Sequence, residues 1–218
     1  MTSLEDRFPQ ASGGNSWYTK VAAVVAAIFV VSILTGIALG GYFSPPGPAS
    51  TEPTSALPTY LYFTVTTSAH TDYDTFYPAN VSVPHGVPVV ISITCYDNGL
   101  NPVPSTFANV IGTVGGSANF TLGPDQAPQE LSALPMANIS HTFSVTLPGQ
   151  AGALLLGAGK PMINVPVPAS PDGINPAIVT FTVTFPDAGV QYEWRCVAPC
   201  DPYSMQTPGF MIGSIDVS

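Results

Sequence analysis

From Thr59 onward, short segments with alternating apolar and polar residues follow one another along the chain. In residues 60–67, for example, Leu61, Phe63 and Val65 fall on one face. A period of two is typical of half-buried β-strands. The segments that we interpret as strands are 60–67, 80–84, 87–96, 141–147, 178–185, 190–195 and 211–217. Because they are short and separated by turns rich in Gly and Pro, we predict an all-β sandwich or barrel over residues 59–218.

The segment 97–140 interrupts this regular series of strands. It is rich in Gly, Pro, Asn and Ser, and it is too long for a plain connection within a compact domain. We therefore treat it as a long insertion and expect local strands at 107–114 and 118–122. The pattern alone does not place these strands in the fold.

Residues 21–43 contain no charged residue. At about 1.5 Å per residue, a helix of this length spans a hydrocarbon core of about 30 Å. Both nearby basic residues, Arg7 and Lys20, lie on its N-terminal side, which predicts a cytoplasmic N-terminus. We expect a short cytoplasmic tail (1–20), a single transmembrane helix (21–43), a Pro/Ser/Thr linker (44–58) and an extracytoplasmic domain at the cell membrane. A cleaved signal peptide is the alternative.

Charged residues make up only 8% of the chain, against about 25% in a typical soluble domain. The formal net charge is −9, and beyond residue 44 the only basic side chains are Lys160 and Arg195. This balance argues against a nucleic-acid partner, whose phosphates need Lys and Arg. It fits either an ordinary secreted β-protein with a neutral surface or an exterior exposed to strong acid, as in an acidophile, where protonated carboxylates carry no charge.

Residues 192–218 carry the clearest candidate chemistry. Cys196 and Cys200 are four residues apart in a Pro-containing loop, and Met211 opens the last predicted strand. Thiolate and thioether sulfur are ligands that copper prefers in its lower oxidation state. Outside a membrane, however, two cysteines also favour a disulfide. Cys95, in an apolar strand, is interpreted as a buried inert thiol and as an alternative disulfide partner.

Three sequence elements together resemble the cupredoxin domain of subunit II of the haem-copper oxidases, the cytochrome and quinol oxidases. They are YPANVSVPHGVPVVISIT, the Ser140-His141-Thr142-Phe143 element, and YEWRCVAPC followed by MIGSIDV. The resemblance covers about residues 60–218 and implies a cupredoxin-like Greek-key β-sandwich. It also implies copper, with Cys196 and Cys200 as bridging thiolates, His141 as an imidazole ligand, Met211 as a weak thioether ligand and Ala198 as a carbonyl ligand.

The sequence departs from that family at one ligand. The family has a second histidine between the second cysteine and the methionine, whereas the interval from Cys200 to Met211 is longer here and contains none. The only histidines are His70, His85 and His141. We expect His70 and His85 to face solvent, so the resemblance predicts a modified site.

Several functions remain open at this point. The first is a membrane-anchored oxidase subunit that receives electrons from a soluble or membrane donor and passes them to a haem-bearing integral membrane subunit. The second is a copper-free subunit of a quinol oxidase with a docking role. The third is a free-standing anchored carrier of the blue-copper type, and a non-enzymatic surface protein is a further alternative. The chain shows no nucleophile triad, phosphate loop or zinc spacing, and Asp72, Asp74 and Asp201 form no evident acid–base pair. We therefore expect an electron-transfer subunit rather than a complete enzyme.

Overall fold

The structure is a computed structural model that describes residues 57–67, 73–155 and 159–218. The predicted tail and transmembrane helix, most of the linker, and His70 lie outside these residues. Among the described residues, no helix has both the length and the apolar character needed to cross a membrane.

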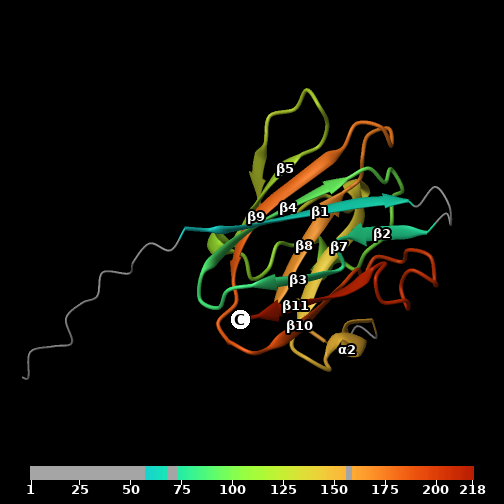
Figure 1. The fold of residues 1–218 in the computed structure, drawn as a ribbon. Coiled ribbons are helices and arrows are strands. Elements are labelled where there is room, and N and C mark those ends of the chain that lie inside the picture. Colours follow the sequence, from blue (N-terminus) through green and yellow to red (C-terminus); the bar gives the residue numbers. More distant parts are fainter. Residues whose placement is uncertain (1–56, 68–72, 156–158) are drawn as a thin grey trace, which may run out of the picture. The chain divides into compact units, whose positions relative to one another are not determined.

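Two β-sheets form the described domain (Figure 1). The first is six-stranded, in the order β2-β1-β4-β9-β5-β6. Its neighbours run antiparallel except for β1 and β4, which are parallel. The strands are β1 (Thr59–Thr67), β2 (Asp74–Tyr77), β4 (Pro88–Cys95), β5 (Ala118–Thr121), β6 (Gln129–Leu131) and β9 (Ala177–Thr184).

The second sheet is five-stranded, in the order β3-β11-β10-β7-β8. Its neighbours are antiparallel except for β3 and β11. The strands are β3 (Asn80–Val83), β7 (Ile139–Thr146), β8 (Ile163–Pro168), β10 (Gln191–Arg195) and β11 (Ile212–Val217). The all-β class is therefore confirmed. Every predicted strand except 107–114 is present, with its ends within two residues of the prediction.

Segment 107–114 is the strand prediction that is wrong. The chain there forms a 3-10 turn, Ser105–Ala108, followed by isolated bridges at Asn109 and Ile111. Two further 3-10 turns, Val114–Gly116 and Met136–Asn138, and a short helix, α2 (Ala151–Leu155), also interrupt the β structure. Phe107, Ala108 and Val110 are buried by turns and isolated bridges rather than by a ladder, and Val114 is exposed, so the hydrophobicity of this segment did not signal a strand.

Strands β2, β6 and β8 were not predicted. Neither β2 (DTFY) nor β6 (QEL) shows an alternation of apolar and polar residues. All six residues of β8 are buried, and its sequence INVPVP does alternate, but prolines at two of its six positions argue against a strand. Its two prolines are tolerated because β8 is the outermost strand of its sheet, where an N–H is not needed for a ladder.

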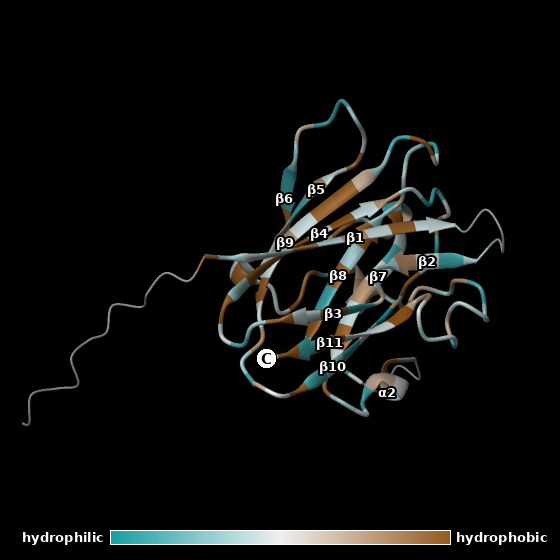
Figure 2. Ribbon diagram, viewed as in Figure 1, coloured by the Kyte–Doolittle hydropathy of each residue, from teal (hydrophilic) through white to brown (hydrophobic). Residues whose placement is uncertain are grey.

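The core lies between the two sheets and is centred on aromatic side chains. Phe63 of β1 contacts Phe143 of β7 with ring centroids 5.2 Å apart, and Phe143 stacks on Trp194 of β10 at 5.4 Å. Phe76 of β2 lies 5.0 Å from Trp194. Figure 2 shows brown and paler residues alternating along β9, as expected for a strand with one buried face. Trp194, fully buried, is therefore a central residue of this core.

Gly213 of β11 allows this core to close. The Trp194 indole nitrogen donates a hydrogen bond to the Ala79 carbonyl at 2.8 Å. A Cβ at Gly213 would lie 1.8 Å from that carbonyl oxygen and 2.4 Å from the indole nitrogen. Only glycine fits at this position, because the Ala79 backbone and the Trp194 ring approach it so closely. Gly213 therefore lets β11 lie directly against the core.

Candidate metal centre

A bulge in β7 sets the direction of the His141 side chain. The pairing of β7 with β8 shifts register between Ile139 and His141, which leaves Ser140 as the extra residue. Successive side chains of a regular strand point to opposite faces. Here, however, Ser140 Oγ and His141 Nε2 both hydrogen-bond to Asp97 Oδ2, at 2.5 and 2.8 Å. Bulges re-aim side chains in this way and are common beside functional sites.

Cys196 continues directly from β10 and is tied to two neighbouring strands. Its N–H donates to the Met211 carbonyl at 3.0 Å, and its Sγ accepts the Thr142 N–H at 3.4 Å. The next residue, Val197, donates its N–H to Thr142 Oγ1 at 2.9 Å. These bonds hold the start of the cysteine loop against β7, so the strand that carries His141 also positions the first thiol.

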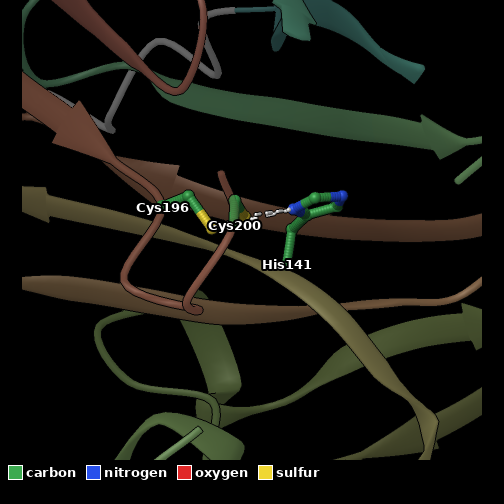
Figure 3. Close-up of side chains that lie close together, drawn as sticks. All are labelled: His141, Cys196 and Cys200. Carbon is green, nitrogen blue, oxygen red and sulfur yellow. Dashed lines mark hydrogen bonds between the residues drawn. The ribbon is translucent and has the colours of Figure 1, made fainter. Parts of the chain in front are cut away.

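The two thiols and the imidazole meet at one point (Figure 3). His141 Nδ1 lies 3.0 Å from Cys200 Sγ and 3.8 Å from Cys196 Sγ, and the two sulfurs are 3.5 Å apart. His141 and Cys196 are fully buried, whereas Cys200 is partly exposed. The three ligand atoms lie within 4.8 Å of one another, which is close enough to share one metal ion.

Met211 and Ala198, the other two candidate ligands, are both buried beside this group. The Cys196 N–H donates to the Met211 carbonyl and so continues the antiparallel pairing of β10 with β11. The two residues are therefore cross-strand neighbours, whose side chains share a face of the sheet. The Ala198 carbonyl accepts the Cys200 N–H at 2.7 Å and lies 3.8 Å from Cys196 Sγ. That carbonyl is therefore near the sulfurs, and one of its lone pairs is already used.

The lengthened interval 201–210 folds as a series of turns. Met205 N–H donates to the Asp201 carbonyl at 3.2 Å, and Met211 N–H donates to the Ser204 carbonyl at 3.2 Å. Tyr203 stacks on Tyr73 with ring centroids 4.5 Å apart. No second histidine joins the group within the described part of the chain. His85 is exposed, as expected, and its Nδ1 lies 3.3 Å from the Ser218 carbonyl oxygen.

Asp97 and Asp74 are the site residues that the sequence did not indicate. The ligand atoms of Asp74, Asp97 and His141 lie within 4.8 Å of one another, and Asp74 accepts a hydrogen bond from Thr67 Oγ1 at 3.0 Å. The one available signal was that Asp97 is the first acidic residue after β4. Nothing local tied it to His141, 44 positions later in the chain.

The protonation states of His141, Cys196 and Cys200 depend on one another. Burial would lower the pKa of His141, but hydrogen bonds to Asp97 and Cys196 outweigh it and raise that pKa to about 10. Burial opposes the Cys196 thiolate, yet hydrogen bonds from Cys200 and His141 hold its pKa well below the ordinary thiol value. The bond to Cys196, aided by burial, raises the pKa of Cys200. The metal-free group thus favours an imidazolium beside one thiolate.

All three cysteines are free thiols, so the disulfide alternative is not realised in this structure. Cys95 is fully buried, its thiol donates to the Asp97 carbonyl at 3.6 Å, and burial raises its pKa to about 12. The interpretation of Cys95 as a buried inert thiol is confirmed. It is not part of the His141 group.

A thiol, an imidazole and a carboxylate in series also resemble an activated nucleophile, which the sequence analysis did not anticipate. Access and protonation together decide against this use. Cys196, whose thiol pKa is lowered, is fully buried, whereas Cys200 is partly exposed but has a raised pKa, which disfavours its thiolate. Two surface clefts lie elsewhere. One of these clefts is lined by residues that include Leu122 and Ser170, and the other by residues that include Gln191. The arrangement is better suited to holding an ion away from water than to attacking a substrate.

Comparisons with known proteins give no family. No protein-family model matches the chain, and no curated protein matches it. The solved structures with similar sheets include copper proteins. Reduced rusticyanin has a TM-score of 0.40 at 16% identity, over 74% of this chain and 77% of that one. Auracyanin A, a "blue" copper protein from Chloroflexus aurantiacus, has a TM-score of 0.35 at 16% identity, over 74% and 99%. Auracyanin B has a TM-score of 0.35 at 15% identity, over 73% of this chain and 88% of that one.

These likenesses describe similar β-sheets and are too low to carry an argument about the site. Membership of the oxidase subunit II family, which the sequence motifs suggested, is not shown by them. The chemistry of the site therefore rests on its own geometry. One imidazole nitrogen and two sulfurs converge, His141 and Cys196 are fully buried, and Met211 is the buried cross-strand neighbour of Cys196. Such a donor set fits copper, because thiolate and thioether ligands select its lower oxidation state and imidazole also suits it.

Proposed function

We propose that this domain holds a copper ion and transfers electrons outside the cell membrane. His141, Cys196 and Cys200 would bind the ion, with Met211 as a weak ligand and the Ala198 carbonyl beside the sulfurs. The observation that supports this is the convergence of His141 Nδ1 and two cysteine sulfurs within 4.8 Å, with His141 and Cys196 fully buried. Bound copper would supply a one-electron redox couple.

The protein's own part is to keep the ligands fixed and dry. His141 lies on a strand whose eight residues are all buried, and Cys196 is bonded to β7 and to the segment before β11. Ligands held by two strands of one sheet move little when the charge of the ion changes. The aromatic core excludes water from one side, since Phe76 lies with its ring centroid 6.0 Å from that of His141. Burial and hydrogen bonding at such a site set its redox potential.

For the wider role, we propose a membrane-anchored, subunit II-like component of a haem-copper oxidase. Residues 21–43 would anchor it with the N-terminus in the cytoplasm. The domain would accept electrons from a soluble or membrane donor and pass them to a haem-bearing membrane subunit. Support for this partner comes from the sequence motifs around His141 and Cys196. A free-standing anchored carrier is the second candidate, favoured by the lack of a second histidine between Cys200 and Met211, because one imidazole suits a single ion.

Copper loading of the full-length chain in detergent tests the proposal. We expect one copper per chain and a sulfur-to-copper charge-transfer absorption band. Cys196→Ala should abolish the band, whereas Cys95→Ala, which removes a buried thiol outside the group, should keep it. A chain that takes up no stoichiometric copper, or one whose band survives Cys196→Ala, would refute the copper site and favour a docking or surface role. Co-purification with a haem-containing membrane subunit would separate the oxidase role from the free carrier.

A further inference from the structure

The largely buried carboxylate of Asp97 contacts His141 at Nε2, the ring nitrogen that does not face the sulfurs. Asp97 Oδ2 accepts a hydrogen bond from His141 Nε2 at 2.8 Å and one from Ser140 Oγ at 2.5 Å. Its Oδ1 accepts the Gly99 N–H at 3.0 Å. The side chain is only 11% exposed. Three donors from two chain segments therefore fix both oxygens, and the carboxylate has little freedom to turn away from the ring.

The two nitrogens of His141 consequently have different roles. A carboxylate at 2.8 Å requires a hydrogen on Nε2. Nδ1 is then the nitrogen that faces Cys196 and Cys200, at 3.8 and 3.0 Å, and that can offer a lone pair to an ion between them. A carboxylate on the far nitrogen of a ligating histidine fixes the ring orientation and makes the ligand nitrogen more basic.

We propose that Asp97 is a positioning residue of the metal centre, which locks His141 with Nε2 protonated and Nδ1 directed at the sulfur pair. This inference rests on the proposed copper function. It gives the start of the 97–140 insertion a role, because Asp97 opens that segment and Ser140 closes it. The bulge in β7 serves the same contact by letting Ser140 and His141 reach one oxygen.

Asp74 provides a matched control within the same cluster. Its carboxylate lies within the same 4.8 Å group, but its hydrogen bond goes to Thr67 Oγ1. Asp74→Asn therefore removes a nearby negative charge and leaves the bond to His141 in place. Asp97→Asn removes a charge and keeps an acceptor for Nε2–H, and Asp97→Ala removes both. The three variants separate the positioning of the ring from the general effect of charge.

The experiment measures copper affinity and the His141 Nε2 proton in the full-length chain. We expect Asp97→Ala to weaken copper binding by about 10- to 100-fold, Asp97→Asn by less, and Asp74→Asn least. In ¹H–¹⁵N spectra of the metal-free chain, Nε2–H should be a slowly exchanging signal in the wild type, Asp97→Asn and Asp74→Asn, and should be lost in Asp97→Ala.

Two results would overturn the inference. One is an Asp97→Ala chain with wild-type copper affinity and an unchanged Nε2–H signal. The other is an Asp74→Asn chain that loses as much affinity as Asp97→Ala, because this would assign the effect to charge alone. If the wild type binds no copper, the proposed function fails, and the Nε2–H signal of the metal-free chain still decides whether Asp97 holds the ring. If Asp97→Ala does not fold, Asp97→Asn against Asp74→Asn keeps the affinity comparison.

Discussion

Replacing Gly213 with alanine tests how closely the last strand is held against the core. The added Cβ would lie 1.8 Å from the Ala79 carbonyl oxygen and 2.4 Å from Trp194 Nε1. The first of these atoms belongs to the backbone and the second to a fully buried ring, so neither can move aside cheaply. Either the Ala79 backbone or the Trp194 ring must therefore move, and the hydrogen bond of 2.8 Å between Trp194 Nε1 and the Ala79 carbonyl oxygen is the nearest interaction to break.

The expected loss follows from these two costs. Forcing an extra carbon into a well-packed core costs about 1–3 kcal/mol, and losing a buried hydrogen bond costs about 1 kcal/mol more. We therefore expect the free energy of unfolding to fall by about 2–4 kcal/mol. In a domain of this size that corresponds to a decrease in melting temperature of roughly 4–16 °C. Thermal and urea unfolding of the full-length chain, followed by tryptophan fluorescence, measures both quantities.

Gly152→Ala is the control. Gly152 is exposed in α2, and a Cβ there would meet no atom within 4 Å. Alanine is favoured over glycine in a helix by about 0.5–1 kcal/mol, so this variant should be as stable as the wild type or slightly more so. If Gly213→Ala unfolds within about 0.5 kcal/mol of the wild type, a range typical of surface substitutions, the close approach of β11 to Trp194 is not what the structure implies.

Three further outcomes are expected. Asn164→Ala should lower the free energy of unfolding, measured in urea, by about 3 kcal/mol. The buried Asn164 amide donates to the carbonyls of Phe107 and Asn109 at 3.0 and 2.7 Å, and its removal leaves both carbonyls unpaired. An unchanged unfolding midpoint would contradict this. Thr146→Val should be neutral or stabilising by up to about 1 kcal/mol, since Thr146 Oγ1 is buried without a hydrogen-bond partner in the described part of the chain. A clear loss would refute that reasoning. Despite burial, the pKa of Asp97 is lowered from 3.8 by hydrogen bonds from His141 and Ser140, so its contribution to stability is present above about pH 4 and lost as the pH falls further. The pKa of His141 is raised from 6.5 to about 10, so its contribution is complete below about pH 6.5 and lost as the pH rises toward 10. The free energy of unfolding of the metal-free wild type should therefore exceed that of Asp97→Asn by most between about pH 4 and about pH 6.5. A difference that does not change with pH would contradict the pairing of Asp97 with protonated His141.

Local sequence patterns predicted much of the site. The strand that carries His141, the loop that carries Cys196 and Cys200, and the strand that follows Met211 all lie close to their predicted positions. They could be predicted because an alternating strand and a cysteine loop are properties of neighbouring residues. Asp97 could not be found in this way, because its bond to His141 spans 44 positions and depends on a bulge in β7.

The sequence by itself therefore determined the class of the domain and which residues could offer soft ligands. It also showed that the ligand loop lacks a second histidine. Only the tertiary structure decided which side chains meet. The pairing of β10 with β7 and β11 brings Cys196 to His141 and Met211, and the end of β4 brings Asp97 to the opposite side of the ring. Strand periodicity depends on adjacent residues, whereas register and sheet order depend on the packing of the whole core, which no single segment encodes.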